Sequence, residues 1–499
     1  MGRQFVKIGS AVLATAMLVT GCSSTSGGST EGSTETASAN PTGEKITLRI
    51  LENDTAKSQG YLDELLNAFN KAYADQGIEA VDANMEEYSD LAENGPYGYG
   101  PDVLYQANDQ IMTYAEDKHI MALNLEDYEC YDKVPQEAFD AFKITVDGTD
   151  YYCGIPVNVQ EPMLFYRADM MPENWETEWD QDGNGVADFF ESWNALYAYS
   201  KYLRENDESA NKDSQYGLMA PLNDLYMMAE FTFSYGGYVF GLDEEGNYDS
   251  SDIGFNKGDS ATGLLAMKEF ASLMSEECID DSVKTSRYSK VADGTFFCSI
   301  STPDTYTLFH EKLVAVYEEE GLSADEAEQK ATENLMMVEL PSKMPANGDI
   351  TADPATLSDS DYVDTQVMGG VNGYAISAYT KHKEACVAFI NFATSYDMIS
   401  MRADILGIAP TRSDVASEIG GVTDTIFNSL EAGNIYLMPS IKAVDQIWDP
   451  MQTLFADVAK DAFRAKNGEA EKYTDVDSMQ KALDNSVQSI YDAIYTLAQ

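Results

Sequence analysis

The sequence predicts an α/β fold divided into two lobes. Short apolar runs alternate with longer amphipathic stretches from about residue 46 onward, the pattern of strands and helices in a mostly parallel sheet. The chain has 499 residues, enough for two or three domains. No long low-complexity linker interrupts this part. We therefore expect two lobes that exchange strands rather than domains joined end to end.

The first elements follow from the spacing of their apolar residues. We expect a strand at 46–51, a helix at 61–74 and a second strand at 102–105. Because parallel sheets bind ligands in crevices beyond the ends of their strands, residues that follow the strands are candidates for a site. The predicted helix carries four apolar side chains on one side: Leu62, Leu65, Leu66 and Phe69.

Acidic residues dominate the charge. The chain has 31 Lys and Arg against 85 Asp and Glu, a formal net charge of −54, and 44% of its residues are hydrophobic. The hydrophobic content supports a large buried core and excludes a wholly disordered chain. The negative charge argues against binding to nucleic acid, which needs clustered Lys and Arg, and against attraction to an anionic membrane surface.

The first 45 residues predict export and anchoring. Residues 1–21 form a charged start and a short apolar stretch, typical of a signal peptide and shorter than the roughly 20 apolar residues that span a bilayer. Cys22 resembles the lipidated cysteine of a bacterial lipobox; an ordinary signal peptide with a chance cysteine is the alternative. Cleavage removes two basic residues and leaves a formal charge of −56. Segment 22–45, rich in Ser, Gly and Thr, is predicted to be a flexible tether.

The cysteines and histidines do not predict a zinc site. The three histidines lie far apart and in no HExxH pattern, which disfavours zinc hydrolase chemistry. Beyond the lipobox the number of cysteines is odd and no CxxC spacing occurs, so neither a zinc cage nor a full disulfide framework is indicated. These cysteines are Cys130, Cys153, Cys278, Cys298 and Cys386.

Segment 180–191 reproduces the EF-hand calcium loop. Oxygen-bearing residues stand at loop positions 1, 3, 5, 9 and 12, and Gly185 at position 6 allows the sharp turn. We expect a structural calcium ion within an insertion at 172–192, next to a helix that begins near Trp193; an acidic turn without an ion is the alternative. The expected ligands are Asp180, Asp182, Asn184, Val186 through its carbonyl, Asp188 and Glu191.

Five segments taken together, in chain order, resemble a known family. They are similar to the extracellular solute-binding proteins of ABC sugar importers, and most similar to the maltose/maltodextrin-binding branch. Each match alone is unspecific, but together they cover nearly the whole chain after the tether. The segments are 100–115, 154–169, 236–254, 369–392 and 438–448.

The resemblance implies the two-lobed periplasmic-binding-protein fold of type II. Two α/β lobes are then joined by crossover hinge strands, with a sugar held in the cleft. The closed form of such proteins docks on the subunits of a membrane permease. The N-lobe is expected at 46–158 and about 373–412, and the C-lobe at 159–372 and about 413–499.

The family's sugar-contacting positions map onto polar and aromatic residues of this chain. Asp109 matches an acid that accepts hydrogen bonds from sugar hydroxyls, and Gln110 stands where the family usually has Arg. Solvated loop carboxylates, and a core indole at 448, are the alternatives. The other implied ligand contacts are Gln160 at a family Glu, its neighbour Glu161, Asp224, Tyr226 as a stacking ring, Asp304 at a lost family Trp, Tyr306 as its substitute, and Trp448 as the main stacking indole.

These features predict a binding protein that is not an enzyme. Hydroxyl acceptors and aromatic faces suit a neutral oligosaccharide, and malto-oligosaccharide is favoured by the family branch. Another neutral oligosaccharide is the first alternative. A secreted acidic glycosidase with two carboxylates about 5–9 Å apart and a calcium-dependent surface adhesin are the others. We expect a monomer that works with permease subunits and is held at the cell membrane through Cys22.

Overall fold

The computed structural model describes residues 40, 43–86, 91–146, 149–205, 216–243, 247–420, 423, 426–427, 429–430 and 433–495. The predicted signal peptide, Cys22 and most of the predicted tether lie outside the described residues. None of the described helices combines the length and the apolar character needed to cross a membrane.

The first sheet contains seven strands in the order β16-β6-β15-β3-β1-β2, with β17 paired to β15. The predicted strand at 46–51 is confirmed as β1 and the strand at 102–105 as β3. The predicted helix is confirmed as α2 (Tyr61–Tyr73), whose four predicted apolar residues are all buried. The strands are β1 (Ile46–Leu51), β2 (Ile78–Asp82), β3 (Val103–Ala107), β6 (Ile155–Gln160), β15 (Val367–Ile376), β16 (Ala409–Pro410) and β17 (Ile435–Leu437).

The expectation of a mostly parallel sheet is wrong. β1 is parallel to β2 and β3, but β15 runs antiparallel to both β3 and β6, and β16 is antiparallel to β6. The reason lies in the chain path, because β15 enters this sheet from the elements of the second sheet and therefore runs back against its neighbours. All ten residues of β15 are buried.

The second sheet has four strands in the order β12-β7-β11-β8. It is also mixed, since β7 is antiparallel to β11 and β12, whereas β8 is parallel to β11. Its strands are β7 (Met163–Arg167), β8 (Tyr216–Met219), β11 (Phe296–Ser301) and β12 (Leu335–Glu339), and α7 (Trp193–Glu205), α11 (Val283–Ala292), α12 (Tyr306–Glu319) and α13 (Ala324–Asn334) are its main helices.

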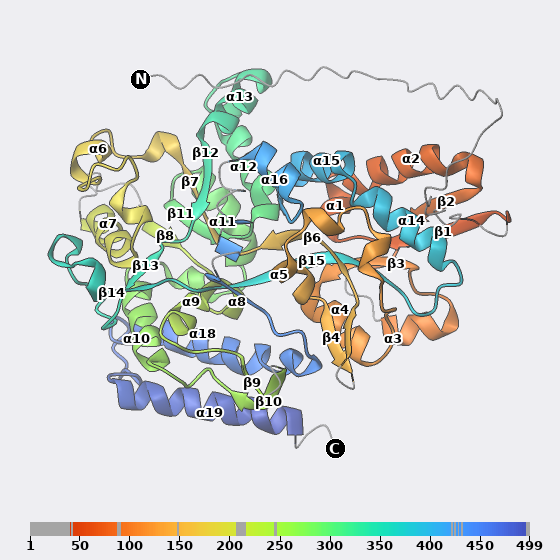
Figure 1. Cartoon of the computed structure of the whole chain (residues 1–499). Helices are drawn as coiled ribbons and strands as arrows, with labels where there is room; N and C mark the ends of the chain where they lie inside the picture. Colours follow the sequence, from red (N-terminus) through yellow and green to blue (C-terminus); the bar gives the residue numbers. More distant parts are fainter. Residues whose placement is uncertain are drawn as a thin grey trace. The chain divides into compact units, whose positions relative to one another are not determined.

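The chain crosses between the two sheets several times. β6 of the first sheet ends at Gln160, and β7 of the second sheet begins at Met163. After β12, the last strand of the second sheet, the chain returns to the first sheet as the long strand β15 (Figure 1). Residues 39–499 form one compact unit. The sheets therefore exchange strands, and the lobe boundaries given above stay a prediction.

A buried ion pair stabilises the first sheet. Glu52 follows β1 and Arg402 lies on α15 (Tyr396–Leu406); neither side chain is exposed. Arg402 donates two hydrogen bonds to Glu52, Nη1 to Oε1 at 2.8 Å and Nη2 to Oε2 at 3.0 Å. The guanidinium carbon lies 3.9 Å from the ring centre of Tyr105 on β3, and Tyr374 on β15 donates its hydroxyl to Glu52. One cation thus connects the three central strands.

The C-terminal helices are joined through Asp461. Its fully buried carboxylate accepts from the backbone amides of Lys472 and Tyr473 at 2.7 and 2.9 Å and pairs with Lys268 Nζ at 2.9 Å. Burial opposes ionisation, but these donors and Arg464 together lower the pKa of Asp461 to about 2. The carboxylate therefore ties α18 (Trp448–Arg464) and the segment before α19 (Val476–Tyr495) to α10 (Ser260–Ala271).

Glu230 has no comparable partner. It begins α9 (Glu230–Phe233), its side chain is fully buried, and neither carboxyl oxygen has a hydrogen-bond partner from another described residue. Burial raises the pKa of Glu230 well above its ordinary value of 4.5. Above pH 4.5, Glu230 therefore stays protonated in the folded chain, whereas in the unfolded chain it releases its proton.

Glu230→Gln is expected to remove a pH-dependent loss of stability. The free energy of unfolding of the native protein should fall, relative to that of the variant, by about 1.4 kcal/mol per pH unit above 4.5, until the pH reaches the raised pKa. Urea unfolding between pH 4.5 and 8 measures this difference. Glu318→Gln, at an exposed position of α12, is the control and should show no such slope. A constant difference for Glu230→Gln across this range would contradict the prediction.

Candidate functional site

Ends and turns of several strands meet where the two sheets join. The hydroxyl of Tyr226 on α8 (Leu225–Met228) donates to the carbonyl of Gln160, the last residue of β6, at 2.8 Å. Asn108, the first residue of α4 (Asn108–Glu116), is fully buried. Its Nδ2 donates to the carbonyl of Met438, just after β17, at 3.1 Å, and its Oδ1 accepts from the amide of Val371 on β15 at 3.2 Å.

Two glycines of β15 make this close approach possible. A Cβ on Gly370 would lie 3.1 Å from Met438 Cε, 3.4 Å from Asn108 Oδ1 and 4.0 Å from the Tyr226 hydroxyl. A Cβ on Gly369 would lie 2.1 Å from Ile435 Cγ2. The pair of glycines in the segment at 369–392 therefore has a packing reason, because a side chain at Gly369 would push Ile435 of β17 away from β15 and one at Gly370 would crowd Met438.

Three carboxyl groups gather around the Tyr226 hydroxyl. Asp109 is 8% exposed and Glu161 is 3% exposed. Asp109 Oδ1, Glu161 Oε1 and Asp304 Oδ1 are each buried and accept no hydrogen bond within the described part of the chain. Burial, followed by the charges of Glu161, Asp304 and Asp109, raises the pKa of Tyr226. The three groups, called the acid cluster below, therefore lie near enough to one hydroxyl for their charges to act on it, as does Asp224.

Desolvation controls the protonation of the acid cluster. Burial raises the pKa of Asp109 to about 6, and the charge of Asp445 adds to this effect. Burial raises the pKa of Glu161 well above its ordinary value, with a further contribution from Glu339, and burial also raises that of Asp304. Buried carboxyl oxygens without partners are costly, so a ligand that donates hydrogen bonds would be favoured here.

Asp224 and Gln160 position Tyr226. Asp224 caps α8, because its Oδ1 accepts from the amides of Tyr226 and Met227 at 3.0 and 3.4 Å. Its Oδ2 also lies 3.3 Å from Lys284 Nζ. Gln160 binds the Tyr226 hydroxyl through its carbonyl, and its side chain hydrogen bonds to Asp304. Two of the expected ligand contacts therefore already have partners within the protein.

The remaining predicted contacts lie on helix starts. Gln110 follows Asp109 on α4 and is half-buried. Tyr306 begins α12 and stacks on His310 with ring centres 6.0 Å apart. Trp448 begins α18 and is half-buried against the core, so it is not an enclosed core indole. No direct contact connects these three side chains to the acid cluster among the described hydrogen bonds and ring pairs.

Sequence reasoning missed four residues that shape the site: Asn108, Gly370, Glu339 and Asp445. Asn108 had a signal, because an amide directly after a predicted strand and before a candidate acid can join neighbouring backbones. Glu339 and Asp445 had none, since they come close to Glu161 and Asp109 only through the tertiary fold.

The predicted calcium loop forms a tight turn at 180–191. Asp180 Oδ1 and Oδ2 accept from the amides of Asn184 and Gly185, both at 3.0 Å. The Asn184 side-chain amide donates to Asp182 Oδ2 at 3.1 Å and to Glu191 Oε1 at 2.6 Å. Within the described residues, no three His, Cys, Asp or Glu side chains converge as a ready-made metal site. In this loop the Asn184 side-chain amide lies between the carboxylates of Asp182 and Glu191.

The loop borders a small hollow and is fastened to α7. Asp182, Asp188 and Glu191 line a cavity of about 150 Å³. Burial, followed by the charges of neighbouring loop acids, raises the pKa of Asp188 and of Glu191. The Trp179 ring packs on Tyr199 of α7 with ring centres 5.0 Å apart. The insertion is thus anchored to the helix that follows it.

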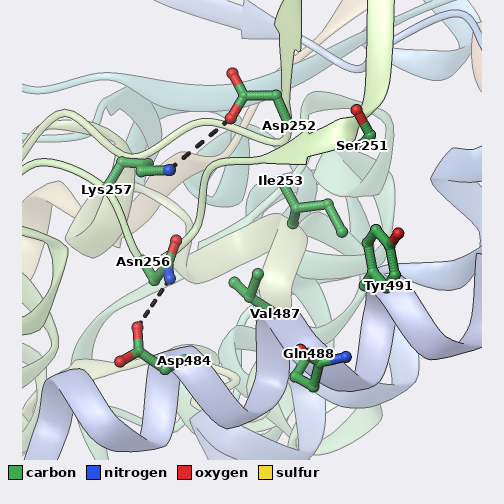
Figure 2. Close-up of a pocket in the computed structure, with 9 residues that line it drawn as sticks. All are labelled: Ser251, Asp252, Ile253, Asn256, Lys257, Asp484, Val487, Gln488 and Tyr491. Carbon is green, nitrogen blue, oxygen red and sulfur yellow. Dashed lines mark hydrogen bonds and ion pairs between the residues drawn. The ribbon is translucent and has the colours of Figure 1, made fainter.

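A separate groove of about 330 Å³ lies between β10 (Tyr248–Ile253) and α19 (Figure 2). It is crossed by a hydrogen bond from Asn256 Nδ2 to Asp484 Oδ1 at 2.8 Å and by the pair of Lys257 and Asp252 at 4.0 Å. None of the predicted ligand or metal residues lines this groove.

The sequence matches a protein family over most of its length. Residues 64–427 match the family described as bacterial extracellular solute-binding protein. The chain belongs to this family. Members of the family bind solutes outside the cytoplasm, which agrees with the predicted export and with the resemblance found in the sequence.

Two curated relatives from Bacillus subtilis (strain 168) match part of the chain. A galactooligosaccharide-binding protein is 28% identical over 241 residues, which are 48% of this chain and 50% of the relative. The maltodextrin-binding protein MdxE is 26% identical over 253 residues, 50% of this chain and 52% of the relative. The chain therefore spans about half the length of the curated relatives it matches.

Solved structures of similar fold cover nearly the whole chain. The maltose-binding periplasmic protein MalE from Listeria monocytogenes, in complex with maltose, has a TM-score of 0.63 at 18% identity and covers 90% of this chain and 98% of its own. MalX from Streptococcus pneumoniae, in complex with maltopentaose, has a TM-score of 0.64 at 15% identity and covers 90% and 100%. These matches confirm the predicted two-lobed periplasmic-binding-protein fold.

Proposed function

We propose that the protein captures a neutral oligosaccharide at the junction of the two sheets and delivers it unaltered to an ABC permease. The acid cluster around Tyr226 carries this proposal. Its three buried, unpartnered carboxyl oxygens need hydrogen-bond donors, and the hydroxyls of a sugar supply them. The half-buried ring of Trp448 offers an apolar face of the kind on which a pyranose stacks.

Charge supports a neutral ligand over an acidic one. The acid cluster adds to a chain whose formal net charge is −54. A phosphorylated or uronic sugar would meet like charge on entry and again beside buried carboxyl groups. The family consists of binding proteins, so release of an intact sugar is proposed and hydrolysis by a glycosidase is not.

Malto-oligosaccharide is the first candidate ligand. The curated relative MdxE is a maltodextrin-binding protein, and the structural neighbours MalE and MalX hold maltose and maltopentaose. The other curated relative is a galactooligosaccharide-binding protein, which makes a galactooligosaccharide the second candidate. Gln110 stands where the family usually has Arg, so the hydrogen bonds to the sugar differ from those of that branch.

Calorimetric titration of the unlipidated full chain is expected to give micromolar binding, about −8 kcal/mol, with maltotriose or with a galactooligosaccharide. Asp109→Asn should weaken binding by at least about tenfold, because a charge-assisted hydrogen bond is worth about 1.5–3 kcal/mol. Asp449→Asn, an exposed acid next to Trp448, is the control and should bind like the native protein. The proposal is wrong if no neutral oligosaccharide gives heat, or if the sugar is cleaved during the titration.

We also propose that segment 180–191 binds calcium with a structural role. Five side chains and the Val186 carbonyl supply oxygen donors in the EF-hand order, which suits a cation that prefers six to eight oxygens. Asp182, Asp188 and Glu191 face one hollow. Binding requires the Asn184 amide to turn its oxygen, rather than its nitrogen, toward these carboxylates. The ion would then hold the insertion on α7.

Calcium is expected to raise the melting temperature at concentrations of about 0.1–1 mM, the range of extracellular calcium modules. Glu191→Gln should weaken this effect by at least about tenfold, since it removes a bidentate ligand. Glu178→Gln removes the same charge from an exposed position outside the loop and is the matched control. Equal melting temperatures with calcium and with a chelator would contradict the proposal.

The anchor forms the last part of the proposed function. We propose that Cys22 is lipidated and that the tether holds the body near its permease; support comes from the signal peptide and lipobox pattern. Cys22→Ala should move the protein from the membrane fraction to the medium or the soluble extracytoplasmic fraction. Retention of the variant in the membrane fraction would contradict this.

A further inference from the structure

The Asn108 side chain joins three segments of the site. The pairing of β3 with β15 ends at Ala107 and Asn372. At the next position the amide of Val371 donates to Asn108 Oδ1 at 3.2 Å, so a side chain extends the ladder where α4 begins. Asn108 Nδ2 donates at 3.1 Å to the carbonyl of Met438, whose own amide donates to Gly369 at 3.1 Å.

The joined segments carry the proposed sugar contacts. Asp109 is the residue after Asn108, and Trp448 begins the helix that follows the segment from Met438. That segment is also fastened to the far end of α4, because Lys442 donates its amide to Glu116 at 2.9 Å and pairs with Asp117 at 2.6 Å.

The two fastenings differ in strength. Lys442 and Asp117 are both about half exposed, and such ion pairs contribute little. Asn108 is fully buried and hydrogen bonds to two backbone groups, so its loss would leave buried polar groups to be satisfied elsewhere. Beside the pairing of β17 with β15, Asn108 is therefore the buried link between the start of α4, which carries Asp109, and the segment that leads to the Trp448 indole.

We propose that Asn108 is a positioning residue for ligand binding, which rests on the proposed sugar-binding function. It does not touch the sugar. It holds the carboxyl at the start of α4 and the segment leading to the stacking indole in one fixed arrangement, so that both engage the same ligand.

Asn108→Asp isolates this role. The change keeps the size of the side chain and the oxygen that accepts from Val371, but it replaces the donor to Met438 by a second oxygen. Asn194→Asp is a matched control on α7, because Asn194 is also fully buried and its Nδ2 donates to the Ala352 carbonyl at 3.1 Å. Both variants therefore place a carboxyl group in the core, so the loss of stability from that change is common to both.

Sugar affinity is the first readout. Asn108→Asp should weaken binding of the oligosaccharide that the native protein binds by at least tenfold, whereas Asn194→Asp should change it less than twofold. Equal affinities of the native protein and Asn108→Asp overturn the proposal.

Hydrogen exchange of the ligand-free protein gives a second readout that needs no sugar. Peptides covering 435–448 should exchange at least tenfold faster in Asn108→Asp than in the native protein, and unchanged exchange overturns the proposal. If the native protein binds no sugar, the proposed function is contradicted. The hydrogen-exchange measurement still tests whether Asn108 holds the segment 435–448 in place. Asn108→Ser, neutral and smaller, serves both measurements if Asn108→Asp does not fold.

Discussion

Three buried carboxyl oxygens that lack hydrogen-bond partners among the described residues dominate the physical chemistry of this protein. Each unsatisfied oxygen costs about 1–3 kcal/mol, and the charges of Asp445 and Glu339 add to the cost of ionising Asp109 and Glu161. A fold that keeps such groups together around the Tyr226 hydroxyl is arranged for a ligand that brings donors. A polyhydroxylated, uncharged ligand meets this need without adding charge.

The rest of the structure holds this cluster in place. β15 pairs with β3, β6 and β17 and is buried along its whole length, and its two glycines leave room for Ile435 of β17, Met438 and Asn108. Behind it, the enclosed pair of Arg402 and Glu52 fixes the three central strands of the first sheet. Removing one partner of such a pair is far more costly than losing a surface pair, so the packing of these three strands depends on it.

Local patterns in the sequence were sufficient for some elements and insufficient for others. Leu62, Leu65, Leu66 and Phe69 repeat with the period of a helix, so α2 could be predicted together with its buried face. The antiparallel direction of β15 could not, because it depends on where the chain has been before it returns, and no residue of β15 carries that information. The alternation of strands and helices and the absence of a linker predicted two α/β lobes, and the resemblance to solute-binding proteins supplied the periplasmic-binding-protein fold.

In the candidate site too, some residues could be predicted from the sequence and others could not. Asp109, Glu161, Asp304 and Tyr226, proposed from family positions, do come together, although more than 190 residues separate the first from the third. The capping role of Asp224 and the influence of Glu339 and Asp445 were not predictable, because they arise from contacts between distant segments. No pattern in the sequence indicated the groove between β10 and α19.

A crystal structure of the protein with its bound oligosaccharide tests the central claim most directly. Sugar hydroxyls are predicted within hydrogen-bond distance of Asp109, Glu161 and Asp304, with one pyranose ring against the Trp448 indole. A sugar bound elsewhere, for example in the groove between β10 and α19, with the three carboxyl oxygens still unpartnered, would contradict the account.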